Sequence, residues 1–224
     1  MAIAFDNSTQ RARYTAGSNP TFSHTCTGSD LILFVFVNVI NPASNRATAV
    51  TYNGVSLTKV RDVFPQSNVN TSLWYLVNPA TGSNTVSITL NAALGTYVDC
   101  AAVSYTGVAQ SSPIDVSDSS TSNASSITDS VTTTTDNCWV VASGYHGDTS
   151  SGGFSTGMTN REITITGSRR GIIGDSNSVV SPAGSKSATI NGNSTQTCGI
   201  VIAAFKPAGA APAATPFSQA IIIM

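Results

Sequence analysis

The stretch that decides the fold runs from Leu31 to Ile40 and reads LILFVFVNVI. Asn38 is its only polar residue. The run has the length of a β-strand and about half of the roughly 20 apolar residues that a membrane-spanning helix needs. A strand that is apolar at consecutive positions must be covered on both faces. The run therefore predicts a central strand of a layered β-structure, and no membrane span.

The segments that follow this run alternate between strand and turn signals. Ala47–Tyr52 and Val55–Val63 flank Asn53-Gly54, a dipeptide typical of a type I′ hairpin turn because both central residues need a positive φ. Asn84–Leu90 (NTVSITL) alternates apolar and hydroxyl side chains, the pattern of a strand with one buried face. Both segments predict antiparallel neighbours for the central strand.

The rest of the chain continues the same pattern. Further strands are predicted at Ser72–Val77, Tyr97–Thr106, Asn137–Tyr145, Arg161–Thr166, Gly171–Asp175, Lys186–Ile190 and Thr197–Phe205. Ser117–Ser130, which is rich in Ser, Thr, Asn and Asp, is predicted to form an exposed loop with a short strand at its end. No segment keeps the spacing of an amphipathic helix, and strands at intervals of roughly 8–12 residues are typical of sandwiches and barrels. We therefore expect an all-β fold, an antiparallel two-sheet β-sandwich of jelly-roll type.

The composition changes after Phe205. Lys206–Pro216 (KPAGAAPAATP) is a Pro/Ala linker that favours an extended backbone. It leads to an apolar end whose large side chains are Phe217, Ile221, Ile222, Ile223 and Met224. We expect a β-sandwich domain over residues 1–206 and a linker with an apolar C-terminal arm over residues 207–224. The arm is predicted to dock on another subunit, and the alternative that Ile221–Ile223 closes the domain as a last strand stays open.

Charge and composition exclude several classes of protein. Of 224 residues, 41% are hydrophobic and 9% are charged, with 10 basic residues against 11 acidic ones. This balance lacks the basic surplus of a nucleic-acid-binding protein, and the apolar content argues against disorder. The first residues, MAIAFDNSTQRAR, do not read as a secretory signal, so we expect synthesis in the cytoplasm.

The residues that carry metal or acid–base chemistry are few. Cys26, Cys100, Cys138 and Cys198 form no CxxC pair, so buried free thiols are favoured over a zinc site, while disulfides stay open. A Ser-His-Asp set can be written from His146 and Asp148, but no G-x-S-x-G motif supports it. We therefore predict a protein that is not an enzyme, with no catalytic residue, no cofactor and no metal.

Two tryptophans are the residues that could form a ligand platform. Trp74 lies in SLWYLV and Trp139 in NCWVVASGY, and an exposed aromatic face would stack on a sugar ring. Both rings are set in apolar strand segments, where large aromatic residues pack in the core. Core packing is the favoured interpretation, and a platform at Trp74 and Trp139 is the alternative.

Several of these segments together resemble a known group of proteins. The succession LILFVFVNVI, VTYNGVSLTKV, LWYLVNPATGSNTVSITL, YVDCAAVSYTGVAQSSPID and DNCWVVASGY is similar to β-sandwich proteins from the structural gene clusters of tailed bacteriophages. Similar modules occur in secreted bacterial surface proteins. The resemblance covers roughly Leu31 to Tyr145 and includes the short pieces YNGVSLT and SYTGV.

The resemblance implies a structural component of a virion that is assembled in the host cytoplasm. The first expectation is a capsid decoration (cement) protein, homo-oligomeric, whose partners are the major capsid protein or other virion subunits. The alternative is a tail or fibre part that binds a receptor, or a carbohydrate-binding adhesin module. The family carries no catalytic signature that could be transferred to residues of this chain, and neither a nucleic acid nor a membrane is an expected partner.

Overall fold

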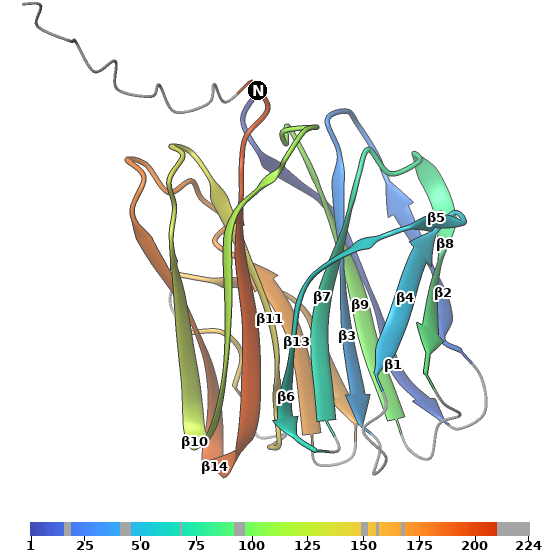
Figure 1. Ribbon diagram of the computed structural model, residues 1–224, viewed down its shortest axis with the longest axis vertical. Helices are drawn as coiled ribbons and strands as arrows, with labels where there is room; N and C mark the ends of the chain where they lie inside the picture. Colours follow the sequence, from blue (N-terminus) through green and yellow to red (C-terminus); the bar gives the residue numbers. More distant parts are fainter. Residues whose placement is uncertain are drawn as a thin grey trace, which may run out of the picture.

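The described part of the chain is built of β-strands. The structure, a computed structural model, describes residues 1–15, 19–40, 46–67, 69–91, 97–148, 152–155, 157–166 and 169–209. These residues form fourteen strands in three antiparallel sheets (Figure 1). None of the described segments forms a helix long and apolar enough to cross a membrane. The all-β, antiparallel prediction is confirmed, with three sheets in place of the predicted two.

The described strands form a central sheet, a small sheet and a C-terminal sheet. The central sheet has the order β1 (Ala4–Thr15), β9 (Tyr97–Thr106), β3 (Ile32–Ile40), β7 (Val69–Val77) and β6 (Thr58–Gln66). The small sheet has the order β2 (Thr21–Cys26), β8 (Gly82–Leu90), β4 (Ala47–Tyr52) and β5 (Val55–Ser56). The C-terminal sheet has the order β10 (Ile114–Thr132), β14 (Ser185–Phe205), β11 (Trp139–His146), β13 (Arg169–Asp175) and β12 (Thr159–Thr166).

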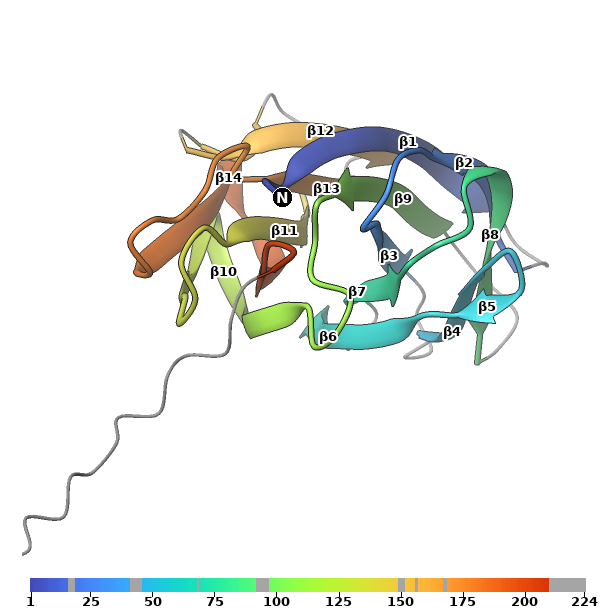
Figure 2. The same ribbon diagram turned by 90° about the horizontal axis from the view of Figure 1, so that it is seen from above.

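Strand β3 shows that the central sheet is covered on both faces. Every residue of Ile32–Ile40 is buried, and β3 pairs with β7 on one side and β9 on the other. Leu33 and Val35 belong to the core shared with the small sheet, whereas Phe34 and Phe36 belong to the core shared with the C-terminal sheet. Figure 2 shows the small sheet and the C-terminal sheet on opposite sides of β3 and β9. The predicted central strand is confirmed.

Aromatic rings dominate the core between the central and C-terminal sheets. The ring centroids of Phe34 and Phe205 lie 5.2 Å apart, and those of Tyr105 and Phe205 lie 5.0 Å apart. Gly171 leaves room for a further ring, because a Cβ atom there would lie 2.8 Å from the Phe36 ring. Edge-to-face and tilted aromatic pairs of this kind add to the stabilisation from buried area. Large aromatic side chains therefore fill the space between the central and C-terminal sheets.

The predicted hairpin forms, but its second strand divides. Asn53 and Gly54 have φ values of 49° and 77°, as a type I′ turn requires. The strand predicted at Val55–Val63 is interrupted at buried Leu57, whose amide donates to the carbonyl of Val50 at 2.8 Å. Residues before this point pair with β4 in the small sheet, and residues after it form β6 in the central sheet. The segment predicted as one strand is therefore shared between two sheets.

The loop predicted at Ser117–Ser130 is wrong, since these residues lie within strand β10. This strand pairs with β14 from Ile114↔Phe205 to Thr132↔Ser185, with register shifts between Ile114 and Val116 and between Ala124 and Ser126. The strands predicted at Lys186–Ile190 and Thr197–Phe205 are the two ends of β14. Beyond the shift, Ile127 and Val131 face inward and are buried, while Ser and Thr occupy the outer face. Pairing with β14 satisfies the backbone, so a hydroxyl-rich segment forms a strand.

Candidate functional site

An open pocket lies at the end of the molecule where the first and last described residues meet. Residues 1–3 precede β1, and residues 206–209 follow β14 (Figure 1). The amide of Ala208 donates to the carbonyl of Gly107 at 2.8 Å, and the Met1 amino group donates to the carbonyl of Ala208 at 3.3 Å. Gly107 has a φ of 70°, and a Cβ atom there would lie 2.1 Å from the carbonyl oxygen of Ala2. Glycine at position 107 therefore lets the two chain ends lie side by side.

The pocket has a volume of about 610 Å³, within the range of roughly 300–1,000 Å³ of ligand sites. One wall is apolar and consists of Ile3, Val179, Pro207 and Ala208. The polar segment 134–137, which precedes β11, also lines the pocket and is called the polar wall. Gly209, the last residue that the structure describes, is also part of the lining.

Hydrogen bonds to two aspartates fix the polar wall. Asp115 accepts from the amide and hydroxyl of Thr134, both at 2.7 Å, and from the hydroxyl of Thr135 at 3.0 Å. Burial alone would raise the pKa of Asp115, but these hydrogen bonds outweigh burial and hold the pKa below its usual value. Asp136 accepts from the amide of Ala183 at 2.6 Å. The carboxylates therefore hold backbone in place, and the pocket lining combines carboxylate, hydroxyl, amide and apolar groups.

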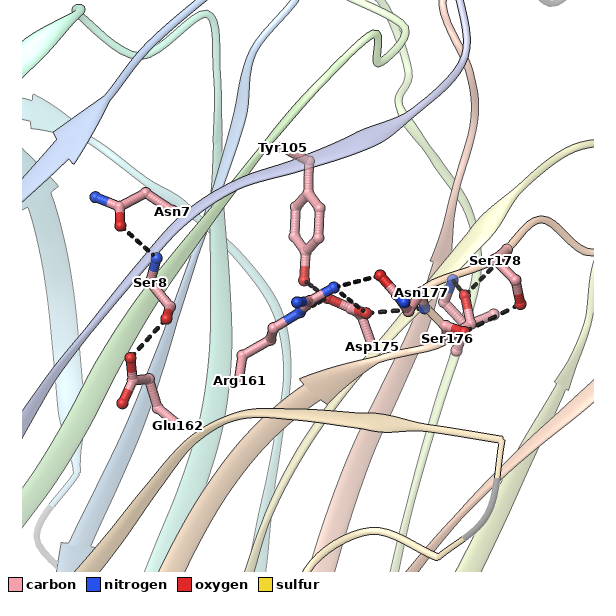
Figure 3. A network of polar contacts seen from close by, with 10 residues as sticks. Asn7, Ser8, Tyr105, Arg161, Glu162, Asp175, Ser176, Asn177 and Ser178 are labelled. Atoms are coloured by element: carbon pink, nitrogen blue, oxygen red, sulfur yellow. Dashed lines mark hydrogen bonds and ion pairs between the residues drawn. The ribbon is translucent and has the colours of Figure 1, made fainter.

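A second polar cluster, centred on Asp175, lies between the central and C-terminal sheets (Figure 3). The carboxylate of Asp175 accepts from Arg161 at 2.6 and 3.1 Å, from the Tyr105 hydroxyl at 2.8 Å and from the Asn177 amide at 2.8 Å. The Arg161 guanidinium also lies over the Phe5 ring, 3.8 Å from its centroid. Burial, reinforced by the neighbouring Asp175 carboxylate, raises the pKa of Tyr105 well above its usual value. These groups bond to one another, so the cluster fixes β9, β12 and β13 together.

A third polar cluster, centred on His24, lies between the central and small sheets. The two ring nitrogens of His24 contact the hydroxyls of Thr9 at 3.0 Å and Ser104 at 3.1 Å. The Ser104 hydroxyl donates to Asp6 at 2.6 Å. Burial lowers the pKa of His24 to about 4, although the Asp6 carboxylate acts in the opposite direction. His24 is therefore neutral at pH 7 and serves as a buried partner of two hydroxyls.

His146 and Asp148, which the sequence allows as parts of a catalytic set, lie at the bend of the paired strands β10 and β14. The His146 ring is buried, and a Cβ atom at Gly192 would lie 2.2 Å from it. Burial, with a further contribution from Arg170, lowers the pKa of His146. Asp148 accepts from the Asn193 amide at 2.9 Å and the Ser194 hydroxyl at 2.8 Å. Asp148 therefore holds residues 193–194 by hydrogen bonds, and the His146 ring packs against Gly192.

Both tryptophans of the alternative ligand platform lie in the core. Trp74 is 5% exposed, and its Nε1 donates to the Ser72 hydroxyl at 2.9 Å. Trp139 is 7% exposed and packs edge-on against Tyr105, with ring centroids 5.9 Å apart. Neither ring has a free face for a sugar, so the structure places these residues as the core interpretation expects.

The four cysteines are buried and free, as the favoured interpretation predicts. Among the described residues, no group of three or more His, Cys, Asp or Glu side chains is arranged to hold a metal ion. The predicted arm residues Phe217, Ile221, Ile222, Ile223 and Met224 lie outside the described residues.

Sequence reasoning did not find the pocket residues. Val179 follows a stretch of small polar residues, and Thr134–Asn137 reads as an ordinary turn. The pocket combines three segments that are far apart in the sequence, 1–3, 134–137 and 207–209, with Val179. No local pattern marks them, because the site exists only where the strand ends converge.

No protein-family model, curated protein or solved structure matches this chain. The resemblance to phage β-sandwich proteins therefore stays a prediction that rests on the segments between Leu31 and Tyr145.

Proposed function

We propose that this chain is a non-enzymatic structural protein of a tailed-bacteriophage particle, a capsid decoration (cement) protein that stabilises the particle through subunit contacts. The proposal includes the finer architecture that the sequence predicts, a jelly-roll-like sandwich with an extended arm over residues 207–224. Its partners would be the major capsid protein or other virion subunits, and its location the virion.

The observation that carries the proposal is the position of Gly209, the last described residue, from which the sequence continues into the apolar C-terminal segment. The segment begins after Gly209, on the lining of an open pocket, and ends in FSQAIIIM. Such a segment gains free energy by covering apolar surface on another molecule. A protein that binds only the assembled particle stabilises it by mass action, without any chemistry. A body with buried polar clusters and a short apolar arm suits that role.

The alternative of a receptor-binding or carbohydrate-binding module has less support. It depends on an exposed aromatic platform, and Trp74 and Trp139 are buried. The pocket that the chain does offer has no aromatic side chain among the described residues of its lining, which combines aliphatic side chains with the polar segment Thr134, Thr135, Asp136 and Asn137. We therefore keep the virion role as the single proposal.

The test measures whether the protein is present in phage particles and how its removal changes their thermal stability. Phage particles from the bacterial host that carries the gene are purified by density gradient and analysed by quantitative mass spectrometry. We expect the chain at a copy number comparable to that of the capsid subunit. Particles that lack the chain are expected to release their DNA at a lower temperature. A chain that is absent from purified particles and is found in the cell-envelope fraction would contradict the proposal.

A further inference from the structure

The pocket and the origin of the C-terminal segment lie at the same end of the molecule. Pro207, Ala208 and Gly209 line the pocket, and the chain continues from there into residues 210–224. Hydrogen bonds from Lys206 to Pro113 and from Ala208 to Gly107 hold the start of this segment on the body. The point of departure is therefore fixed relative to the pocket.

The mouth of the pocket carries apolar surface that water does not favour. Val179 is 46% exposed and Met1 is 73% exposed, and both line the pocket. Only five large hydrophobic residues in the described part of the chain are exposed by 40% or more. Ile3 lies buried beneath them. Two of the five, Met1 and Val179, line this pocket, so an aliphatic side chain bound there would cover exposed apolar surface.

The chain itself provides a segment of matching chemistry. Residues 217–224, FSQAIIIM, carry Phe217, three consecutive isoleucines and Met224 and no charged side chain. The aliphatic side chains of this segment match the apolar part of the pocket lining, which consists of Ile3, Val179, Pro207 and Ala208, while segment 134–137, with the carboxylate of Asp136, makes the polar part.

The linker decides which copy of the chain provides the occupant. Pro212 and Pro216 bias the residues before them toward an extended backbone. At about 3.1 Å per residue, an extended segment 210–216 carries Phe217 roughly 20 Å away from the pocket where it starts. To return to its own pocket, the linker would have to reverse direction within these few residues. The pocket of a second copy, facing the first end to end, lies within reach.

We propose that this pocket, marked by Val179, receives residues 217–224 of a second copy of the chain. Two copies that meet at this end exchange arms reciprocally, because each carries both the arm and the pocket there, and a two-fold axis relates them. The inference rests on the proposed function, and it identifies the subunit contact as one between copies of this protein.

Disulfide trapping between two differently tagged, co-expressed full-length chains tests the exchange. One chain carries Val179→Cys, and the other carries a cysteine at one arm position, in turn Phe217→Cys, Ile222→Cys and Met224→Cys. The matched control replaces Val179→Cys by Val55→Cys, because Val55 is an equally exposed valine, 54% against 46%, on β5. The native thiols are buried and burial raises their pKa values, so they do not compete.

We expect at least one arm position to give a disulfide-linked pair of unlike chains at tenfold or greater yield over the Val55→Cys control. Equal yields at Val179 and Val55 for all three arm positions would overturn the proposal. So would a cross-link that forms only within one chain when both cysteines are placed in the same copy.

The mass of the full-length protein in solution, from light scattering, gives an independent measure. Val179→Asp places a charge at the mouth of the pocket and is expected to convert a dimer into a folded monomer, whereas Val55→Asp leaves the mass unchanged. If Val179→Asp leaves the mass unchanged while Ile222→Asp abolishes incorporation into particles, the pocket inference fails and the proposed function stands. If the exchange is trapped but the chain is absent from particles, the proposed function fails and the exchange stands.

Discussion

The two faces of the central sheet each bury a polar cluster, and the two clusters are built differently. Between the central and C-terminal sheets, the Asp175 carboxylate is surrounded by donors from Arg161, Tyr105 and Asn177. Between the central and small sheets, His24 is held by the hydroxyls of Thr9 and Ser104. The first cluster is charged and the second is neutral at its centre.

The difference shows how a sheet that is covered on both faces accommodates polar atoms. A charge can be buried only where an opposite charge and several hydrogen bonds replace water. Asp175 has both, because Arg161 lies on β12, the strand that pairs with the Asp175 strand β13, and forms an ion pair with it. His24 has no cationic or anionic partner in direct contact, so burial drives off its proton and lowers its pKa to about 4. The same sheet therefore stabilises the charge of Asp175 on one face and keeps the His24 ring uncharged on the other.

Removing the charge of the Asp175 cluster should have the largest effect. Asp175→Asn keeps the size of the side chain but leaves the Arg161 guanidinium without its counter-charge in a site where Asp175 is fully buried. We expect a loss of about 3–5 kcal/mol in the free energy of unfolding, measured by urea denaturation followed by tryptophan fluorescence. A loss under about 1 kcal/mol would show that the two clusters do not differ in the way described.

Acid should act on the His24 cluster. The pKa of His24 in the folded protein lies below the ordinary value of 6.5, so the unfolded chain binds the proton first as the pH falls. The stability contribution of neutral His24 is complete above about pH 6.5 and decreases by up to about 1.4 kcal/mol per pH unit down to about pH 4. We expect wild-type protein to lose about 2 kcal/mol more than His24→Gln between pH 7 and pH 5.

Urea denaturation of both proteins at pH 7, 6 and 5 measures this difference. His146, whose pKa is lowered by burial and by Arg170, is present in both proteins, so its contribution cancels. Identical pH dependence in the two proteins would mean that His24 is not the group that binds the proton on unfolding.

The smallest effect is expected where the same substitution is made outside both clusters. Asp62 forms an ion pair with Lys59 at 3.0 Å, and both side chains are more than a quarter exposed. Water and salt screen such a pair, so Asp62→Asn should cost no more than about 1 kcal/mol, and less at high salt. Measured beside Asp175→Asn, this variant separates the effect of burial from the effect of losing a carboxylate. A loss as large as that of Asp175→Asn would remove burial as the explanation.

Local patterns predicted the strands whose burial is simple. LILFVFVNVI indicated a strand covered on both faces, and β3 is buried at every position. Asn53-Gly54 indicated its turn, because positive φ values are a property of the turn residues themselves. Tyr97–Thr106 forms β9 with the predicted bounds. In each case the residues near one another in the sequence carry the whole signal.

Long-range pairing decided what the patterns missed. Ser117–Ser130 has turn-like composition, yet β14 provides hydrogen-bond partners along all of it. Leu57 diverts one predicted strand from the small sheet to the central sheet, because its amide bonds to Val50 and its side chain is buried. Strands β1 and β2 carry few large apolar residues, and β1 is defined by its pairing with β9.

The sequence by itself determined that the protein is all-β, which strand lies at its centre, that its tryptophans and thiols are buried, and that its chain ends in an uncharged apolar segment. These properties follow from side-chain polarity and turn chemistry, which act over a few residues. Only the tertiary structure decided that there are three sheets, that Asp175 forms an ion pair with Arg161, and that a pocket opens beside Gly209. These depend on contacts between residues as far as 207 positions apart, as Met1 and Ala208 are, and no local pattern encodes which distant strands will meet.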